Sequence, residues 1–422
     1  MKPVNFDINN IYKYLIFFVL LYTSIIISLV FNEDSTGGAF LDYVNQKKIS
    51  QDFAINFKNT FLNFDQYSTR HSPVLIIFLS FFEKIKLDDN LIRLIHLHLC
   101  LLLPIVFFSS LRIKYKFVKP ENLLLLVGLI LLSPTFRSLA IWPDSRLLGL
   151  TLFCVSIYFY LMFEENKKFK NCILNIIFCA ISAYISPNFA LFSIFYFYKF
   201  FIFFKFKINR LIPIILLNLI LSIPAFYYIF ILDVNFLNKA AAVNIDENEN
   251  IFFSNIFNNI LLISSIILFY LFPFLITQII NLNKVFKFDK IVVSLLIFLV
   301  STFYFDYNYQ FTGGGIIFKF SNFFLKNNIL FFILCFVSIL IIINLNNSKF
   351  ENILLLILIL LSNPQITVYH KYYDPFLLIV FFTLFNFNIN LSKINLKLNS
   401  YIIYLFFISF LLISNFKYLW NI

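Results

Sequence analysis

Long apolar segments follow one another along almost the whole chain, and shorter polar stretches separate them. A helix needs about 20 apolar residues to cross the hydrocarbon core of a bilayer. The pattern therefore predicts an all-α fold, a polytopic bundle of about 11 to 13 transmembrane helices, built as a single domain over residues 1–422. The expected crossings are residues 13–31, 90–111, 122–136, 147–163, 171–186, 189–204, 211–232, 252–281, 289–304, 327–346, 351–363, 375–390 and 400–418.

One apolar segment, residues 73–86, departs from this pattern. Pro73 opens it, and the polar stretch 83–86 closes it, so it is too short for a crossing. If it did cross, the basic stretch 112–119 would lie outside and every later loop would invert. We expect instead a re-entrant or juxtamembrane helix within a long first outer loop, residues 32–89.

The charges sort onto two sides of the membrane once the N-terminus is placed in the cytoplasm. The cytoplasmic side then holds 19 of the 33 basic residues and 6 of the 21 acidic residues. This asymmetry is the positive-inside pattern, so the formal net charge of +12 belongs to the cytoplasmic loops and does not indicate nucleic-acid binding. The remaining outer loops are residues 137–146, 186–188, 233–251, 305–326 and 364–374.

The composition supports the same class. The chain is 61% hydrophobic and 13% charged, which excludes a soluble domain of this length. Abundant Phe and Asn are typical of a low-GC genome, which favours a bacterial source. The five cysteines fall inside apolar segments and are expected to be small core residues rather than disulfides or metal ligands. They are Cys100, Cys154, Cys172, Cys179 and Cys335.

The first outer loop begins with two adjacent acids, Glu33 and Asp34, followed by Gly37 and Gly38. An acid at a membrane boundary beside a glycine turn suits a general base. A solvated helix end explains the same pattern equally well. Asp42 and Asp52, further along the loop, are interpreted as ordinary surface acids.

The end of the first loop carries a second group of polar residues. Arg70 offers the planar fork that binds phosphate, and His71 could donate to a sugar or phosphate oxygen before Ser72 and Pro73 open the next segment. The alternative is a cluster that only starts a helix. No metal ligand is assigned here or elsewhere.

Three ionisable residues lie at the start of the second crossing. Ionisable residues at membrane depth are costly and tend to line a cavity, and Arg93 is the functional candidate among them. His96 and His98 are two positions apart and cannot share a helical face, which argues against a two-histidine metal site.

The second outer loop places Arg137 and Asp144 between two helices, with Trp142 as an interfacial anchor. We interpret Arg137 and Asp144 as substrate-binding or phosphate-binding residues. The alternative is an ordinary interfacial turn, in which Trp142 belongs to the aromatic belt, a polar residue caps the next helix, and any surface ion pair is weak.

The loop 364–374 is the densest polar and aromatic cluster in the second half of the chain. His370 and Lys371 are candidates for binding a phosphate, and Tyr372 for stacking on a sugar. An aromatic belt would explain the tyrosines equally well. The loop 306–315, with its three glycines, is interpreted as a mobile loop or a plain connector. No phosphate-cradling or dinucleotide-binding glycine motif is present.

The order of these motifs resembles the GT-C class of membrane glycosyltransferases, including glycosyltransferase family 39 and the dolichyl-phosphate-sugar transferases. That class has an acidic motif after its first helix, a His-Pro step into a juxtamembrane helix, an Arg-headed helix, and a second outer loop with Arg and Asp. The resemblance covers about the first 165 residues, and Ser72 replaces the usual first Pro. The corresponding residues are Glu33, Asp34, His71, Pro73, Arg93, Pro134, Arg137 and Asp144.

The resemblance implies an integral membrane transferase that moves a hexosyl or pentosyl unit from a polyprenyl-phosphate sugar to a lipid or glycan acceptor. Asp34, with Glu33 as the alternative, would deprotonate the acceptor hydroxyl, and cationic side chains would stabilise the departing phosphate. No cofactor is certain, and a divalent cation, Mg²⁺ or Mn²⁺, stays open. The expected location is the bacterial inner membrane, with the active site on the periplasmic face and a cell-envelope glycan as product.

Two other functions remain as alternatives. A flippase or transporter would place charges at the bilayer midplane and show repeated halves, whereas the polar residues here collect at one face. A polymerase or ligase for lipid-linked glycans is closer, because it would also use outer-face Arg and His.

Overall fold

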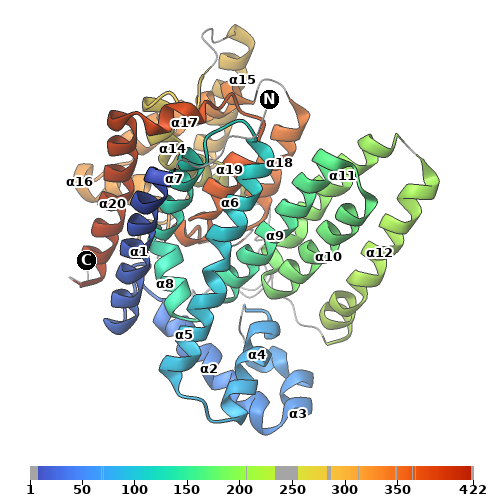
Figure 1. Cartoon of the computed structure of the whole chain (residues 1–422). Helices are drawn as coiled ribbons and strands as arrows, with labels where there is room; N and C mark the ends of the chain where they lie inside the picture. Colours follow the sequence, from blue (N-terminus) through green and yellow to red (C-terminus); the bar gives the residue numbers. More distant parts are fainter. Residues whose placement is uncertain are drawn as a thin grey trace. The chain divides into compact units, whose positions relative to one another are not determined.

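The computed structural model describes residues 8–67, 69, 71–205, 207–232, 255–282, 287–311, 313–346, 349–363, 365 and 367–419. Over this part of the chain the regular structure is helical, with no strand and only an isolated bridge between Ile280 and Ile389 (Figure 1). The predicted all-α fold is therefore confirmed. The chain forms two compact units, one of Met1–Lys239 with Phe407–Ile422 and one of Ala240–Phe406.

Seven helices of the described chain are long and apolar enough to cross a membrane, so the protein is a multi-pass membrane protein. A bent helix pair would make an eighth span. The predicted orientation and the thirteen crossings stay predictions. The seven spans are Tyr12–Val30, Asp89–Lys114, Ser145–Asn166, Pro187–Phe204, Ile208–Ile231, Ile256–Ile276 and Lys397–Phe416.

The helices of the first unit follow the predicted apolar segments closely. They are α1 (Ile8–Val30), α2 (Ala39–Ile55), α3 (Phe57–Leu62), α4 (Pro73–Lys84), α5 (Asp89–Cys100), α6 (Leu102–Lys114), α7 (Pro120–Leu131), α8 (Pro134–Ile141), α9 (Ser145–Asn166), α10 (Phe169–Ile185), α11 (Phe192–Phe204) and α12 (Ile208–Phe226).

The first outer loop is mostly helical, because α2, α3 and α4 lie within it. α4 begins at Pro73, which suits the first position of a helix, and the Ser72 hydroxyl caps it by accepting from the Val74 amide at 3.4 Å. The helices of the loop share a small core, in which Phe53, Phe64 and Ile76 pack together with Tyr228 from beyond α12. Helix α4 confirms the helix expected over 73–86. The depth of α4 in the membrane stays a prediction.

The predicted crossing 122–136 is not one straight helix. It breaks after Leu131, and α7 and α8 meet at an angle of 61°. Pro134 disfavours helical geometry at Ser133, whose hydroxyl then caps α8 by accepting from the Phe136 amide at 2.9 Å. The predicted loop 137–146 is wrong in its first half, because α8 occupies it.

Helices α9 and α10 pack closely around small residues. A Cβ added at Gly149 would lie 2.7 Å from Cβ of Ser186, so only glycine fits there. Polar side chains join the same pair: Ser182 donates to the Gly149 carbonyl at 2.9 Å, and Asn175 donates to the Ser156 carbonyl at 2.9 Å. Small residues and interhelical hydrogen bonds are typical of helix contacts inside membranes.

Most helices of the second unit lie in the predicted segments, but the predicted crossing 375–390 is only the eight-residue helix α19, too short to cross a bilayer as a helix, and one helix is additional. Helix α16 lies inside the predicted loop 305–326, and Gly314 and Gly315 precede and open it with positive φ angles. The five cysteines are all buried and free, as predicted. The helices are α14 (Ile256–Ile276), α15 (Phe288–Phe303), α16 (Gly315–Leu325), α17 (Ile329–Leu345), α18 (Phe350–Leu361), α19 (Phe376–Thr383) and α20 (Lys397–Leu419), the last of which continues into the first unit.

Candidate functional site

Asp34 lies between α1 and α2, and its carboxylate holds the start of α2. Oδ2 accepts from the Gly38 amide at 2.9 Å and the Phe40 amide at 3.1 Å. Oδ1 accepts from the Ala39 amide at 3.1 Å and the Ser138 hydroxyl at 3.0 Å. Thr36 adds a hydroxyl at 3.3 Å to Oδ1, so five donors surround one carboxylate.

These contacts change the interpretation of Asp34. The expectation of a water-facing side chain is wrong, because only 3% of Asp34 is exposed. The glycines before α2 make the arrangement possible: Gly37 has φ of 65° and Gly38 has φ of 120°, values that favour glycine. A carboxylate that is fully engaged in ordering its own loop is poorly placed to take a proton from a substrate.

Glu33 forms a buried ion pair with Arg137 of α8. The guanidinium Nη2 lies 3.1 Å from Oε2 of Glu33, and Nε donates to both carboxylate oxygens at 3.2 and 3.3 Å. Nη1 donates to the Ser24 hydroxyl at 2.9 Å, and Nη2 also contacts the Ser28 hydroxyl. Arg137 is therefore fully engaged within the protein, which ties α8 to α1.

Arg93 of α5 is also engaged in internal contacts. Its guanidinium carbon stacks 3.7 Å above the centroid of the Trp142 ring, and Nε donates to the Ile141 carbonyl at 3.2 Å. The side chain is 4% exposed. These contacts favour a role in fixing the end of α8, because a cation stacked on an aromatic ring has one face covered.

Three residues from separate elements of the first unit converge on one point. One potential ligand atom from each of Asp42, His71 and Asp144 lies within 4.8 Å of the others. Asp42 is in the first turn of α2, His71 precedes α4, and Asp144 is the N-cap of α9. The sequence analysis proposed His71 and Asp144 for substrate binding but treated Asp42 as a surface acid.

Local contacts hold two of these residues in place. The Asp144 Oδ1 accepts from the Arg146 amide at 2.7 Å, as an N-cap residue does. The His71 Nδ1 lies 3.3 Å from the hydroxyl of Ser145, the first residue of α9. All three residues lie at or just before the start of a helix, but this position alone does not distinguish Asp42 from other acids in the sequence.

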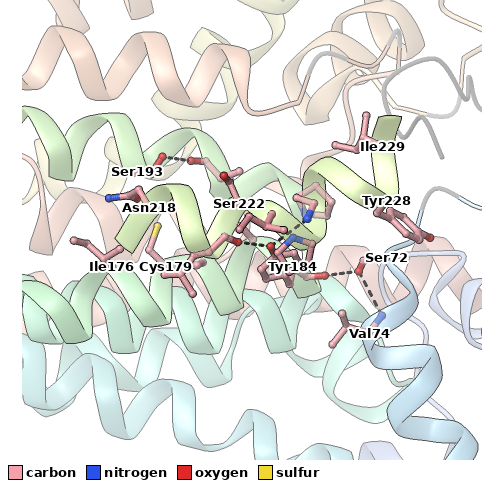
Figure 2. Close-up of a pocket in the computed structure, with 18 of the residues that line it drawn as sticks. Ser72, Val74, Ile176, Cys179, Tyr184, Ser193, Asn218, Ser222, Tyr228 and Ile229 are labelled. Atoms are coloured by element: carbon pink, nitrogen blue, oxygen red, sulfur yellow. Dashed lines mark hydrogen bonds between the residues drawn. The ribbon is translucent and has the colours of Figure 1, made fainter. Parts of the chain in front are cut away.

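An apolar cavity of about 710 Å³ lies among helices of the first unit (Figure 2). Ser72, the residue after His71, lines the cavity, and its hydroxyl donates to the Tyr184 carbonyl at the end of α10. The walls come from α4, α10, α11 and α12, and every described residue in the lining is uncharged. Tyr228, past the end of α12, closes one side.

The predicted residues of the second half, His370, Lys371 and Tyr372, lie in the second unit. His370 is half-buried, and its Nε2 lies 2.9 Å from the Tyr270 hydroxyl; desolvation lowers the pKa of His370 to about 3. The Tyr372 hydroxyl donates to Gln365 at 2.8 Å, and Lys371 lies 5.6 Å from the centroid of the Tyr369 ring. His370 is thus uncharged at neutral pH and offers no positive charge to a phosphate.

Arg70 and the loop 233–251 lie outside the described residues. No protein-family model, curated protein or solved structure matches the chain. The function is therefore inferred from the chemistry of the site alone.

Proposed function

We propose that the protein is an integral membrane glycosyltransferase that moves a sugar from a polyprenyl-phosphate donor to a lipid or glycan acceptor. The observation that carries the proposal is the polar Asp42–His71–Asp144 cluster, in which His71 directly precedes Ser72 of the lining of an uncharged cavity among membrane helices. A substrate with a polar head and a long apolar chain matches both parts, because the head needs polar partners and the chain does not.

The cavity suits an apolar chain by size as well as by chemistry. Its volume of about 710 Å³ lies within the roughly 300–1,000 Å³ typical of ligand pockets. Both α11 and α12 lie in segments long and apolar enough to cross a membrane, so the chain of a lipid substrate could remain in the hydrocarbon region while it occupies the cavity. The lining contains Asn218 and Ser222 but no described charge.

The reaction is a single displacement. The acceptor oxygen bonds to the anomeric carbon, the bond from that carbon to the phosphate oxygen breaks, and the electron pair leaves with the phosphate. The acceptor proton passes to a base, for which the Asp42 carboxylate is better placed than Asp34, because Asp42 is half-buried whereas Asp34 is buried and accepts from five donors. Glu33 and Arg137 then act as positioning residues for the first two outer loops.

The test uses the full chain in nanodiscs with a radiolabelled polyprenyl-phosphate sugar. Ala183→Trp fills the cavity, and Leu219→Trp places the same ring on the exposed face of α12 as a matched control. We expect Ala183→Trp to slow transfer at least tenfold from a long-chain donor and much less from a short-chain donor, and Leu219→Trp to change neither.

Equal losses with both donors would show that the cavity does not hold the chain. An intact protein that flips the lipid-linked sugar across the bilayer without transferring it would overturn the enzyme assignment in favour of a flippase.

A further inference from the structure

We propose that Asp42, His71 and Asp144 form a binding site for one divalent cation of the Mn²⁺ type. The role of this cation in sugar transfer rests on the proposed function, but its binding does not. The residues come from α2, the segment before α4, and the N-terminus of α9, so the fold rather than local sequence brings them together.

The spacing of the three ligand atoms fits one ion. An octahedral cation with bonds of about 2.1 Å holds neighbouring ligand atoms roughly 3 Å apart and opposite ones roughly 4.2 Å apart. The three atoms lie within 4.8 Å of one another, so movements of about 1 Å or less bring all three into contact with a single ion. Half-buried side chains at Asp42 and His71 can make such movements.

Asp144 gives an independent reason to expect a ligand. The side chain is 1% exposed, and its Oδ2 is buried with no hydrogen-bond partner among the described residues. Its other oxygen accepts from the Arg146 amide. A buried carboxylate oxygen without a partner is costly, and a bound cation would satisfy it.

The donor set indicates which cations fit. Two carboxylates supply hard oxygen ligands and two negative charges, which suits Mg²⁺, Ca²⁺ and Mn²⁺. An imidazole ligand favours softer ions than Mg²⁺ or Ca²⁺. Mn²⁺ and Zn²⁺ accept both ligand types, and Mn²⁺ can be followed directly by electron paramagnetic resonance.

The position of the site suits a cation that stabilises the departing phosphate. His71 would hold it next to Ser72 of the cavity lining, on the side where the proposed function places the phosphate of a lipid-linked sugar. A divalent cation there neutralises the charge that develops on the departing phosphate. Three protein ligands leave coordination positions for phosphate oxygens and water.

The site is tested by Mn²⁺ titration of the purified full chain in nanodiscs, with the free Mn²⁺ signal as readout. We expect one strongly bound Mn²⁺ per chain, weakened tenfold or more in Asp144→Asn and in Asp42→Asn. Asp52→Asn is the matched control, since Asp52 lies on α2 but bonds to Tyr67 at 2.9 Å instead. It should bind Mn²⁺ like the unaltered protein.

Asp42→Asn protects the test against misfolding, because Asp144 also caps α9 and its loss could loosen that helix. Absence of Mn²⁺ binding, or equal binding in the Asp42→Asn and Asp52→Asn variants, would overturn the site. Sugar transfer that persists after chelation would then leave the proposed function standing. Conversely, specific Mn²⁺ binding without any transfer would retain the site and reject the function.

Discussion

The sharpest test of the site concerns Asp34, for which the sequence and the structure favour different roles. As a base, Asp34 would be needed for transfer and not for folding. As the residue that orders α2, it would be needed for folding first. The substitution Asp34→Asn separates the two, because it keeps the shape of the side chain and removes its charge.

The contacts set the size of the expected effect. The best amide orientation keeps the carbonyl at Oδ2, facing the Gly38 and Phe40 amides, and turns the NH₂ toward the Thr36 and Ser138 hydroxyls. The Ala39 amide then faces another donor and loses its bond, which costs about 1–3 kcal/mol. The two remaining backbone bonds weaken by about 0.5–1 kcal/mol each without the charge. The loss should be about 2–5 kcal/mol.

The assay is thermal unfolding of the purified protein in nanodiscs, with sugar transfer measured on the same samples. Asp52→Asn, in α2, should shift the unfolding temperature little, because its half-exposed carboxylate accepts only from the Tyr67 hydroxyl among the described contacts. We expect the unfolding temperature of Asp34→Asn to lie well below those of the unaltered protein and of Asp52→Asn. If it unfolds normally while transfer falls 10²- to 10⁴-fold, Asp34 is the base and its structural role has been overstated.

Three further predictions concern other parts of the molecule. Arg137→Met should destabilise by about 3–5 kcal/mol because it leaves Glu33 buried without its cation, and adding Glu33→Leu should restore part of the unfolding temperature. His370 has a pKa of about 3 when folded and about 6.5 when unfolded, so the unfolded chain binds more protons between these values. His370 should therefore contribute a fall in stability as the pH drops from about 6.5 toward 3 and none above 7, and unfolding curves should show this fall weakened in His370→Gln. In a cysteine-free background, Lys116→Cys should not react with an impermeant thiol reagent added outside intact cells. Labelling there would show that residue 116 lies outside and that the predicted topology is inverted.

The apolar pattern predicted most helices because each had to be apolar to cross a bilayer. Breaks were harder to predict. The residues 122–136 look like one apolar segment, but Ser133 and Pro134 stop α7 and start α8. α16 was missed because its glycines and polar flanks are typical of a loop.

The sequence pointed to most residues of the candidate site but not to the role of each residue. Charged residues at membrane depth were expected to be functional, and their internal contacts could not be read from the sequence. Arg93 and Arg137 stack on or pair with other residues of the first unit. Asp42 was passed over because one acid among helical residues carries no signal until its neighbours in space are known. Neither the cavity nor the single point shared by Asp42, His71 and Asp144 has a sequence pattern of its own, since both arise from helices that are distant in the chain.

The bend between α7 and α8 determines how rigid this face of the first unit is. All eight residues of α8 are buried, so a segment that would otherwise be an exposed hinge belongs to the core. Its amides can exchange with solvent only through larger openings of the unit, and epitope insertions there should be poorly tolerated. The α8 side of the first unit is thus preorganised, and larger movements of the unit must arise in its other elements.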